Sequence, residues 1–248
     1  MKEFEIDPFQ NQASERLRGL GIKALLFDLD DTLIYMSEIF KGYMAEYVEV
    51  VSATLEIDPS IFSKRLQELN DEGYQKMGVS PRRWESVLEQ LFYEFNENKA
   101  ITDNLDILMR IYTTEPRIRP GAKAILSGLK ENDLKLCCVT HANSDWTYRK
   151  LTQTGLLDYF DAIEIADENG SKTIENWKKG MELLGVSPDQ CLNVGDNLKG
   201  DIVPSVILGA RAIWMPSPWS VYREGEVPLG VVQMEDLSGF WDAVQKLS

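Results

Sequence analysis

The sequence predicts an α/β protein with a Rossmann-like parallel-sheet core and an inserted all-helical domain. Three observations support this. Residues 22–27 form a short apolar run that stops at Asp28, as in a strand buried on both faces of a sheet. Residues 35–114 carry apolar side chains at helical spacing and show few strand signals. Beyond Gly121, short apolar runs alternate with helical segments of about 10–15 residues, which is typical of βαβ units.

Composition and charge narrow the class of protein. The chain has 248 residues, enough for one large domain or a core with a smaller insert. Its formal net charge of −14 argues against nucleic acid or an anionic membrane as a partner, but does not exclude a small anionic substrate held by a cation. The three cysteines form no Cys-x-x-Cys pair, so buried, reduced thiols are expected rather than a zinc or redox site.

No targeting or membrane segment is evident. Residues 1–8 lack the apolar centre of a secretory leader, and no apolar run approaches membrane-spanning length. We therefore expect a cytoplasmic protein, with monomer and dimer both open.

The first third of the chain leads into the helical insert. A short helix near residues 12–20 precedes the first strand. Four helices are expected in the insert, with Asp58-Pro59 and Ser80-Pro81 as start signals for the second and third: 36–55, 59–69, 81–95 and 102–112. The core then comprises 1–34 and 115–248, and the insert comprises 35–114. An insert after the first strand is well placed to act as a lid.

The rest of the chain returns to the core after the turn at Pro120-Gly121. Helices are expected at 122–131, 144–154, 173–184, 201–208 and 237–247. Strands are expected at 134–139, 162–166, 191–194 and 212–215, with one more at 231–233. These strands extend one parallel sheet.

Polar groups follow several of these strands. The carboxyl ends of parallel strands meet at one edge of a sheet, where ligands bind in open α/β folds. The side chains expected at that edge are Asp28, Asp30, Thr32, Thr140, His141, Asn143, Lys172, Asp196, Asn197 and Asp201.

This set of groups suits phosphoryl transfer. Asp28 and Asp196 offer the hard oxygen ligands that Mg²⁺ accepts, and Mg²⁺ with Lys172 would neutralise a bound phosphate. The Thr140 hydroxyl could bind phosphoryl oxygens. An aspartate can act as a nucleophile and form an aspartyl-phosphate. A second acid two residues later, Asp30, can protonate the leaving group and then activate water.

With these residues in this order, the sequence resembles a known family, the haloacid dehalogenase-like (HAD) hydrolases. Asp28-Leu-Asp-Asp-Thr-Leu33 resembles the first HAD motif, DxDxT, and Val139-Thr140 resembles the second. Lys172 resembles the third, and Gly195-Asp196 with Asp201 resembles the fourth. The four occur in order across the core. The insert between the first two motifs resembles the C1-type cap of that superfamily.

The resemblance implies a role for each residue. Asp28 is implied as nucleophile and Mg²⁺ ligand. Asp30 is implied as general acid/base, with its backbone carbonyl on the metal. The remaining implied roles are phosphate binding by Thr32, Thr140, His141, Asn143 and Lys172, metal binding by Asp196, and support by Asp201 and Asn197. Asp31 is expected to face away and to stabilise the turn.

Some residues distinguish between the reactions known in the family, and others depart from the family pattern. Dehalogenase members have a bulky residue where Asp30 stands, so phosphoryl transfer is favoured. Nothing marks the cap lysines Lys41 and Lys64 as the Schiff-base lysine of phosphonatases. Many members have Pro where Thr173 follows Lys172, which keeps Lys178 and Lys179 as alternatives.

The leading hypothesis is a Mg²⁺-dependent phosphatase acting on a small phosphorylated metabolite. A sugar-phosphate mutase, a non-catalytic binding protein and a phospho-acceptor receiver domain are the alternatives, and the large insert argues against the last. The candidate substrate contacts from the insert and its hinge are Arg82, Arg83, Arg110 and Arg117.

Overall fold

The centre of the molecule is a six-stranded sheet whose strands are all parallel. The computed structural model describes residues 8–248, so the expectation for the first residues of the N-terminus lies outside the described part. The strand order is β5-β4-β1-β6-β7-β8. Their bounds are β1 (Ala24–Phe27), β4 (Lys135–His141), β5 (Ala162–Ala166), β6 (Cys191–Gly195), β7 (Arg211–Trp214) and β8 (Val232–Gln233). This order confirms the predicted Rossmann-like α/β core.

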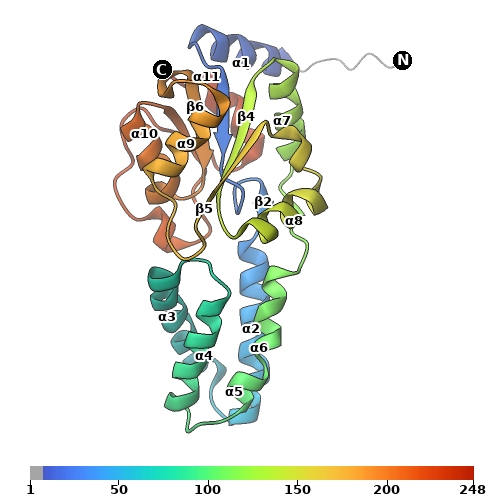
Figure 1. Cartoon of the computed structure of the whole chain (residues 1–248), viewed down its shortest axis with the longest axis vertical. Helices are drawn as coiled ribbons and strands as arrows, with labels where there is room; N and C mark the ends of the chain where they lie inside the picture. The colour runs from blue at the N-terminus through green and yellow to red at the C-terminus, as the bar shows by residue number, and fades with distance from the viewer. Residues whose placement is uncertain (1–7) are drawn as a thin grey trace, which may run out of the picture.

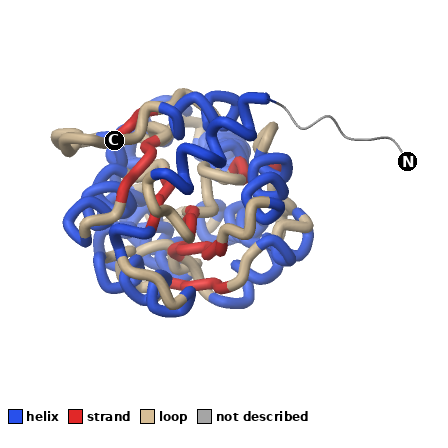
Figure 2. Tube along the Cα trace, turned by 90° about the horizontal axis from the view of Figure 1, so that it is seen from above, coloured by secondary structure: helices blue, strands red, loops and turns tan. Residues whose placement is uncertain are grey.

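Helices cover both faces of the sheet, and seen from above the strands lie among them (Figure 2). The core helices are α1 (Pro8–Gly19), α7 (Ala122–Glu131), α8 (Ser144–Thr154), α9 (Ile174–Leu184), α10 (Val203–Leu208) and α11 (Phe240–Gln245). Successive β1 residues point to opposite faces. Leu25 and Phe27 join the larger apolar cluster, and Leu26 joins the cluster under α9.

Helix α9 lies very close to the sheet, because Gly180 faces it. A Cβ at that position would stand 2.9 Å from Leu26 Cδ2 and 3.0 Å from Val139 Cγ2. The loop before α9 is thereby held over the ends of β1 and β4, next to Asp28.

The helical insert (residues 37–112) forms the lower end of the molecule in Figure 1. It consists of α2 (Ser37–Leu55), α3 (Pro59–Met77), α4 (Arg82–Glu94), α5 (Ala100–Asp103), α6 (Leu105–Met109) and the 3₁₀ turn Arg110–Tyr112. The start of α3 follows the expected signal, since the Asp58 side chain accepts a hydrogen bond from Ser60 N at 2.7 Å and Pro59 occupies the first turn.

The prediction of one continuous fourth helix over 102–112 was wrong. The segment is broken at Asn104, whose φ and ψ of −103° and 18° are not helical. The Asn104 side chain donates to Ala100 O at 2.7 Å. Such local side-chain bonds compete with the helical backbone bonds.

A short strand pair that the sequence did not reveal joins the insert to the core. Strand β2 (Ile34–Tyr35) runs antiparallel to β3 (Arg117–Ile118), with Ile34 opposite Ile118. The chain therefore enters and leaves the insert side by side, just beyond the carboxyl end of β1. Among the described helices, none is both long and apolar enough to cross a membrane.

Candidate active site

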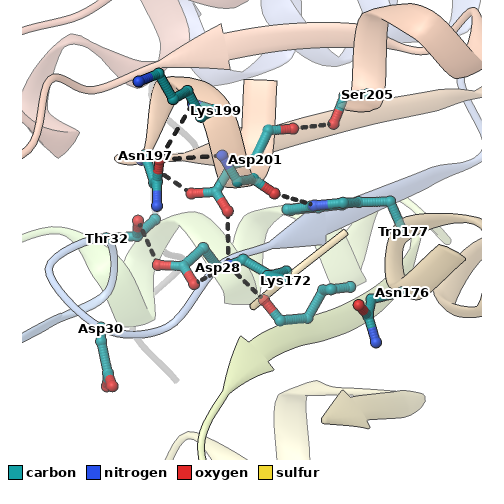
Figure 3. A network of polar contacts seen from close by, with 12 residues as sticks. Asp28, Asp30, Thr32, Lys172, Asn176, Trp177, Asn197, Lys199, Asp201 and Ser205 are labelled. Carbon is teal, nitrogen blue, oxygen red and sulfur yellow. Dashed lines mark hydrogen bonds and ion pairs between the residues drawn. The ribbon is translucent and has the colours of Figure 1, made fainter. Parts of the chain in front are cut away.

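Asp28 lies at the carboxyl end of β1, between β4 and β6. Its backbone N–H donates to Val194 O at 2.9 Å, which extends the β1–β6 pairing to this residue. The side chain is 6% exposed. One carboxylate oxygen accepts from the Thr32 hydroxyl at 3.0 Å, and the other is paired with Lys172 (Figure 3). Both oxygens are thus fixed in orientation before any ligand binds.

Lys172 is the lysine that reaches this strand end. Its ammonium pairs with Asp28 and, at 2.6 Å, with Asp201, and it donates to Val139 O at 3.1 Å. Burial alone would lower the pKa of Lys172, but the charges of Asp201 and Asp28 outweigh burial and raise it, so the amine stays protonated. The alternatives Lys178 and Lys179 are exposed on α9 and pair with Glu182 and Glu164.

Three buried carboxylates converge beside this lysine. Oxygens of Asp28, Asp196 and Asp201 all lie within 4.8 Å of one another. Asp201 lies in a π-helical turn (Leu198–Ile202) that Asn197 caps, since the Asn197 side chain accepts from Lys199 N and Gly200 N. A Cβ at Gly195 would be 2.3 Å from Asp201 Oδ2, so only glycine leaves room for this carboxylate.

The cluster has the chemistry of a cation site. Burial, followed by the charges of Asp28 and Asp201, raises the pKa of Asp196 well above its ordinary value. A divalent cation would relieve that repulsion, and all-oxygen donors suit Mg²⁺. The donor set present in this chain therefore fits Mg²⁺.

The end of β4 supplies an unsatisfied hydroxyl. Thr140 is fully buried, and its Oγ1 has no hydrogen-bond partner within the described part of the chain. A buried polar atom without a partner is costly, so a ligand oxygen is a natural partner for it. Asn143 has a different place: its side chain accepts from Trp146 N at 2.8 Å and caps α8.

His141 follows Thr140 and lies on the wall of a cavity between this strand edge and the helical insert. Its ring packs edge-on against Tyr74 of the helical insert, with centroids 6.3 Å apart. Burial, helped by the charge of Lys172, lowers the pKa of His141 to about 4. The imidazole is therefore neutral near pH 7.

Asp30 is held by a residue that sequence reasoning missed. Lys150 on α8 contacts both Asp30 oxygens, at 2.6 and 2.7 Å, and its side chain is 1% exposed. In Figure 3 the Asp30 carboxylate lies apart from the Asp28–Lys172 pair. Lys150 lies one turn after the buried Trp146, and a lysine on the apolar face of a predicted helix was the signal that could have identified it.

The two remaining polar residues of the first motif, Asp31 and Thr32, make contacts within the loop. The Asp31 carboxylate accepts from Met36 N, Ser37 N and the Ser37 hydroxyl, at the start of α2, which agrees with the expected role in the turn. The expectation that Asp31 faces away was wrong, since it also lines the cavity beside the site. Thr32 is fully buried and contacts Asp28, so its hydroxyl orients that carboxylate and has no place on the cavity wall.

A cavity of about 380 Å³ lies between this strand edge and the helical insert. Asp28, Thr140 and Lys172 line it from the core. Of the four candidate arginines, Arg83 lines it. The other three are directed elsewhere: Arg82 is exposed, Arg110 pairs with Glu46, and Arg117 pairs with Glu38.

The family assignment follows from comparison with known proteins. The family model for haloacid dehalogenase-like hydrolases matches residues 22–203, which span Asp28, Thr140, Lys172 and Asp201. The chain belongs to this family. It is a hydrolase, and its motif residues meet at one edge of the sheet.

Individual relatives share about a quarter of their residues with this chain. A glyceraldehyde 3-phosphate phosphatase from Pyrococcus furiosus is 26% identical over 78% of this chain and 80% of its own length. An N-acylneuraminate-9-phosphatase from Mus musculus is 25% identical over 84% of this chain and 86% of its own. Among solved structures, a haloacid dehalogenase-like hydrolase from Xanthomonas campestris shares the fold, with a TM-score of 0.73, 18% identity and coverage of 91% of both chains.

Proposed function

We propose that this HAD-like hydrolase is a Mg²⁺-dependent phosphatase that cleaves a small phosphomonoester through an aspartyl-phosphate on Asp28. The observation that carries the proposal is the setting of Asp28. Its carboxylate is buried, oriented by Thr32 and Lys172, and lines a cavity together with the unpaired hydroxyl of Thr140. A fixed carboxylate beside phosphate-binding donors is the arrangement that nucleophilic phosphoryl transfer requires.

The reaction has two steps in this proposal. An Asp28 oxygen attacks phosphorus, and the bond from phosphorus to the alcohol oxygen breaks. Asp30 gives its proton to that oxygen, then takes a proton from water, whose oxygen attacks the phosphorus of the aspartyl-phosphate and releases Asp28. Burial raises the pKa of Asp30 despite the opposing charge of Lys150, which favours an acid that can donate this proton. Lys172 and Thr140 hold the phosphoryl oxygens throughout.

Asp28, Asp196 and the backbone carbonyl of Asp30 are the proposed holders of Mg²⁺, with Asp201 holding Lys172 in place. When bound, Mg²⁺ supplies positive charge that offsets the charge of the phosphate and of the carboxylates around it. The neutral His141 is proposed to line the end of the cavity where the phosphate binds. Asn143 and Asn197 are proposed to fix the loops that follow β4 and β6 and carry the site residues.

The helical insert is proposed to act as a C1-type cap, with 1–34 and 115–248 as the catalytic core and 35–114 as the cap domain. Supporting this, the cavity is walled by the insert through Phe40, Tyr74 and Arg83 and by the core through Asp28. Substrate selection would then depend on the insert. Relatives named as phosphatases of small phosphorylated metabolites support the phosphomonoester class. Cytoplasmic location and oligomeric state stay predictions.

The test is hydrolysis of p-nitrophenyl phosphate and of a panel of phosphorylated sugars, acids and nucleotides, with Mg²⁺ and with a chelator. We expect phosphate release that the chelator abolishes. Asp28→Asn should lower kcat by at least about 10³-fold, because the amide is a poor nucleophile. Asp58→Asn is the matched control, since Asp58 is an exposed helix cap for which Asn serves equally well.

Retained activity in Asp28→Asn would refute the nucleophile. Isomerised sugar phosphate in place of free phosphate would favour a mutase. A protein that binds phosphorylated compounds and hydrolyses none would be a binding protein.

A further inference from the structure

Arg83 is a buried arginine in the first turn of α4. It is 3% exposed. Its Nε donates to Asn70 Oδ1 at 3.1 Å and its Nη1 donates to Gly78 O at 2.8 Å. The stem passes Gly73 of α3, where a Cβ would lie 3.7 Å from Arg83 Cβ. These contacts fix the plane of the guanidinium without engaging all of its N–H donors.

The charge of Arg83 lacks a carboxylate partner. The other two buried cations near the cavity are paired, Lys172 with Asp28 and Asp201, and Lys150 with Asp30. Among the ion pairs of residues 12–248, none involves Arg83. Asp71 lies close enough for its pKa to be affected, but it is exposed and hydrogen-bonded to Gln67.

Burying an unpaired charge is costly, and the neighbouring rings compensate only in part. The guanidinium carbon lies 5.6 Å from the centre of the Phe40 ring and 5.1 Å from that of Trp84. Cation–π contacts of this kind contribute less than an ion pair with a bidentate anion. The site therefore favours an anion supplied from outside the chain.

Arg83 lines the same cavity as Asp28, on the side of the helical insert. The core side carries the carboxylates of Asp28 and Asp196 and the ammonium of Lys172, which is already ion-paired. The wall around Arg83 includes the aromatic rings of Phe40, Tyr74 and Tyr222, together with the polar side chains Asn70 and Asp71. A substrate whose phosphate is at Asp28 would therefore extend between aromatic rings toward the guanidinium of Arg83, which has no carboxylate partner.

We propose that the substrate carries a second anionic group, a carboxylate or a second phosphate, that binds Arg83. This inference rests on the proposed phosphatase function and names its substrate class. Arg83 is thus a specificity-determining residue. It contributes binding at the end of the substrate remote from the reacting phosphorus.

Two pairs of phosphomonoesters test the proposal. The carboxylate pair is 3-phosphoglycerate and glycerol 3-phosphate, and the phosphate pair is fructose 1,6-bisphosphate and fructose 6-phosphate. We expect the wild type to prefer the doubly anionic member of at least one pair by about 30-fold or more in kcat/KM. Arg83→Met should remove that preference and Arg83→Lys should keep part of it, because lysine retains charge but not the planar fork. The pair that shows the effect identifies the anion.

Arg82→Met is the matched control, because Arg82 is the exposed neighbour of Arg83 on α4. It should leave unchanged the ratio of kcat/KM values between the two members of each pair. Ratios within a pair are used because a loss of folded protein cancels from them. A wild type that hydrolyses all four compounds with no preference for the anionic members overturns this inference alone, as does an Arg83→Met variant with unchanged ratios. A wild type that hydrolyses no phosphomonoester overturns the proposed function as well.

Discussion

His141 is a neutral imidazole at the junction of core and insert. Its pKa is lowered to about 4, first by burial and then by the charge of Lys172. The chain contains one histidine, so its ring signals in a heteronuclear NMR spectrum need no assignment by mutation. We expect those signals to titrate with a midpoint near pH 4. A midpoint near 6.5 would show a solvated ring and contradict the packing against Tyr74.

The same shift predicts how stability depends on pH. Between about pH 6.5 and 4 the unfolded chain binds a proton at His141 and the folded chain does not. The free energy of unfolding of the wild type should therefore fall relative to that of His141→Gln as the pH decreases through this window. The full effect is of order 3 kcal/mol. Urea unfolding of both proteins across the window measures it.

Lys150 is the clearest single-residue prediction for activity. It holds both oxygens of Asp30, so Lys150→Met should leave the acid without its fixed orientation. We expect kcat to fall by about 10- to 100-fold with a small change in KM, since general acid–base catalysis contributes about 10²–10⁴-fold.

The control is a double-mutant cycle with Asp30→Asn. If Lys150 acts through Asp30, the double variant should be no slower than Asp30→Asn alone. Additive losses would assign Lys150 a role in folding rather than in positioning Asp30.

Sequence reasoning located Asp28, Thr140, Lys172 and Asp196 well, because each lies at a strand end or helix start with its own local signal. Lys150 had none of these. It reaches Asp30 from the middle of α8, across 120 residues of sequence, and only the packing of that helix brings the two together. Thr32 and Asn143 show a related limit. The sequence predicted that both lie near the site, but it did not predict that Thr32 contacts Asp28 or that Asn143 caps α8.

At the scale of elements, the loop after α3 makes a close contact between insert and core. Gly78 has φ of +57° and ψ of −137°, a conformation open mainly to glycine. A Cβ there would lie 2.3 Å from Glu168 O and 2.6 Å from Gly170 O, both in the core loop that leads to Lys172. Neither backbone atom can move aside easily, so the insert docks here only because residue 78 lacks a side chain.

Gly78→Ala should therefore separate this loop from residues 168–170. We expect kcat/KM to fall by about tenfold or more and the protein to lose about 1–3 kcal/mol of stability. Gly42→Ala is the control: Gly42 is exposed in α2 with no neighbour within 4 Å, so alanine should stabilise the helix by about 0.5–1 kcal/mol. Steady-state kinetics and thermal unfolding test both. Normal kinetics in Gly78→Ala would contradict a docked insert as the active form.

Elements differ in how well their sequences predict them. Helices α7 and α8 and strand β5 have the expected bounds, because caps, Gly stops and apolar runs mark each end. The β2–β3 pair escaped prediction because two residues per strand give no periodicity. The fourth helix of the insert failed because the side-chain bond of Asn104 outweighed a favourable apolar spacing.

At the scale of the whole molecule, the order of motifs predicted the fold, and the fold explains why distant motifs form one site. Strands β4, β1 and β6 are neighbours, so Thr140, Asp28 and Asp196 end at one edge although they are far apart in sequence. The orientation of the insert over that edge was not predictable, because it depends on contacts such as those of Gly78 and His141. Arg83 became distinct from Arg82 only through this arrangement.

The central claim is that Asp28 carries the phosphoryl group during turnover. The most direct test uses Asp30→Asn with ³²P-labelled p-nitrophenyl phosphate under single-turnover conditions and an acid quench. The p-nitrophenolate leaves without a proton from Asp30, so the first step proceeds while release by water should be slow. Borohydride then reduces any acyl phosphate to homoserine, and mass spectrometry locates it. We predict ³²P on the protein and homoserine at position 28. An unlabelled protein that still releases phosphate, or a label on another residue, would contradict the account.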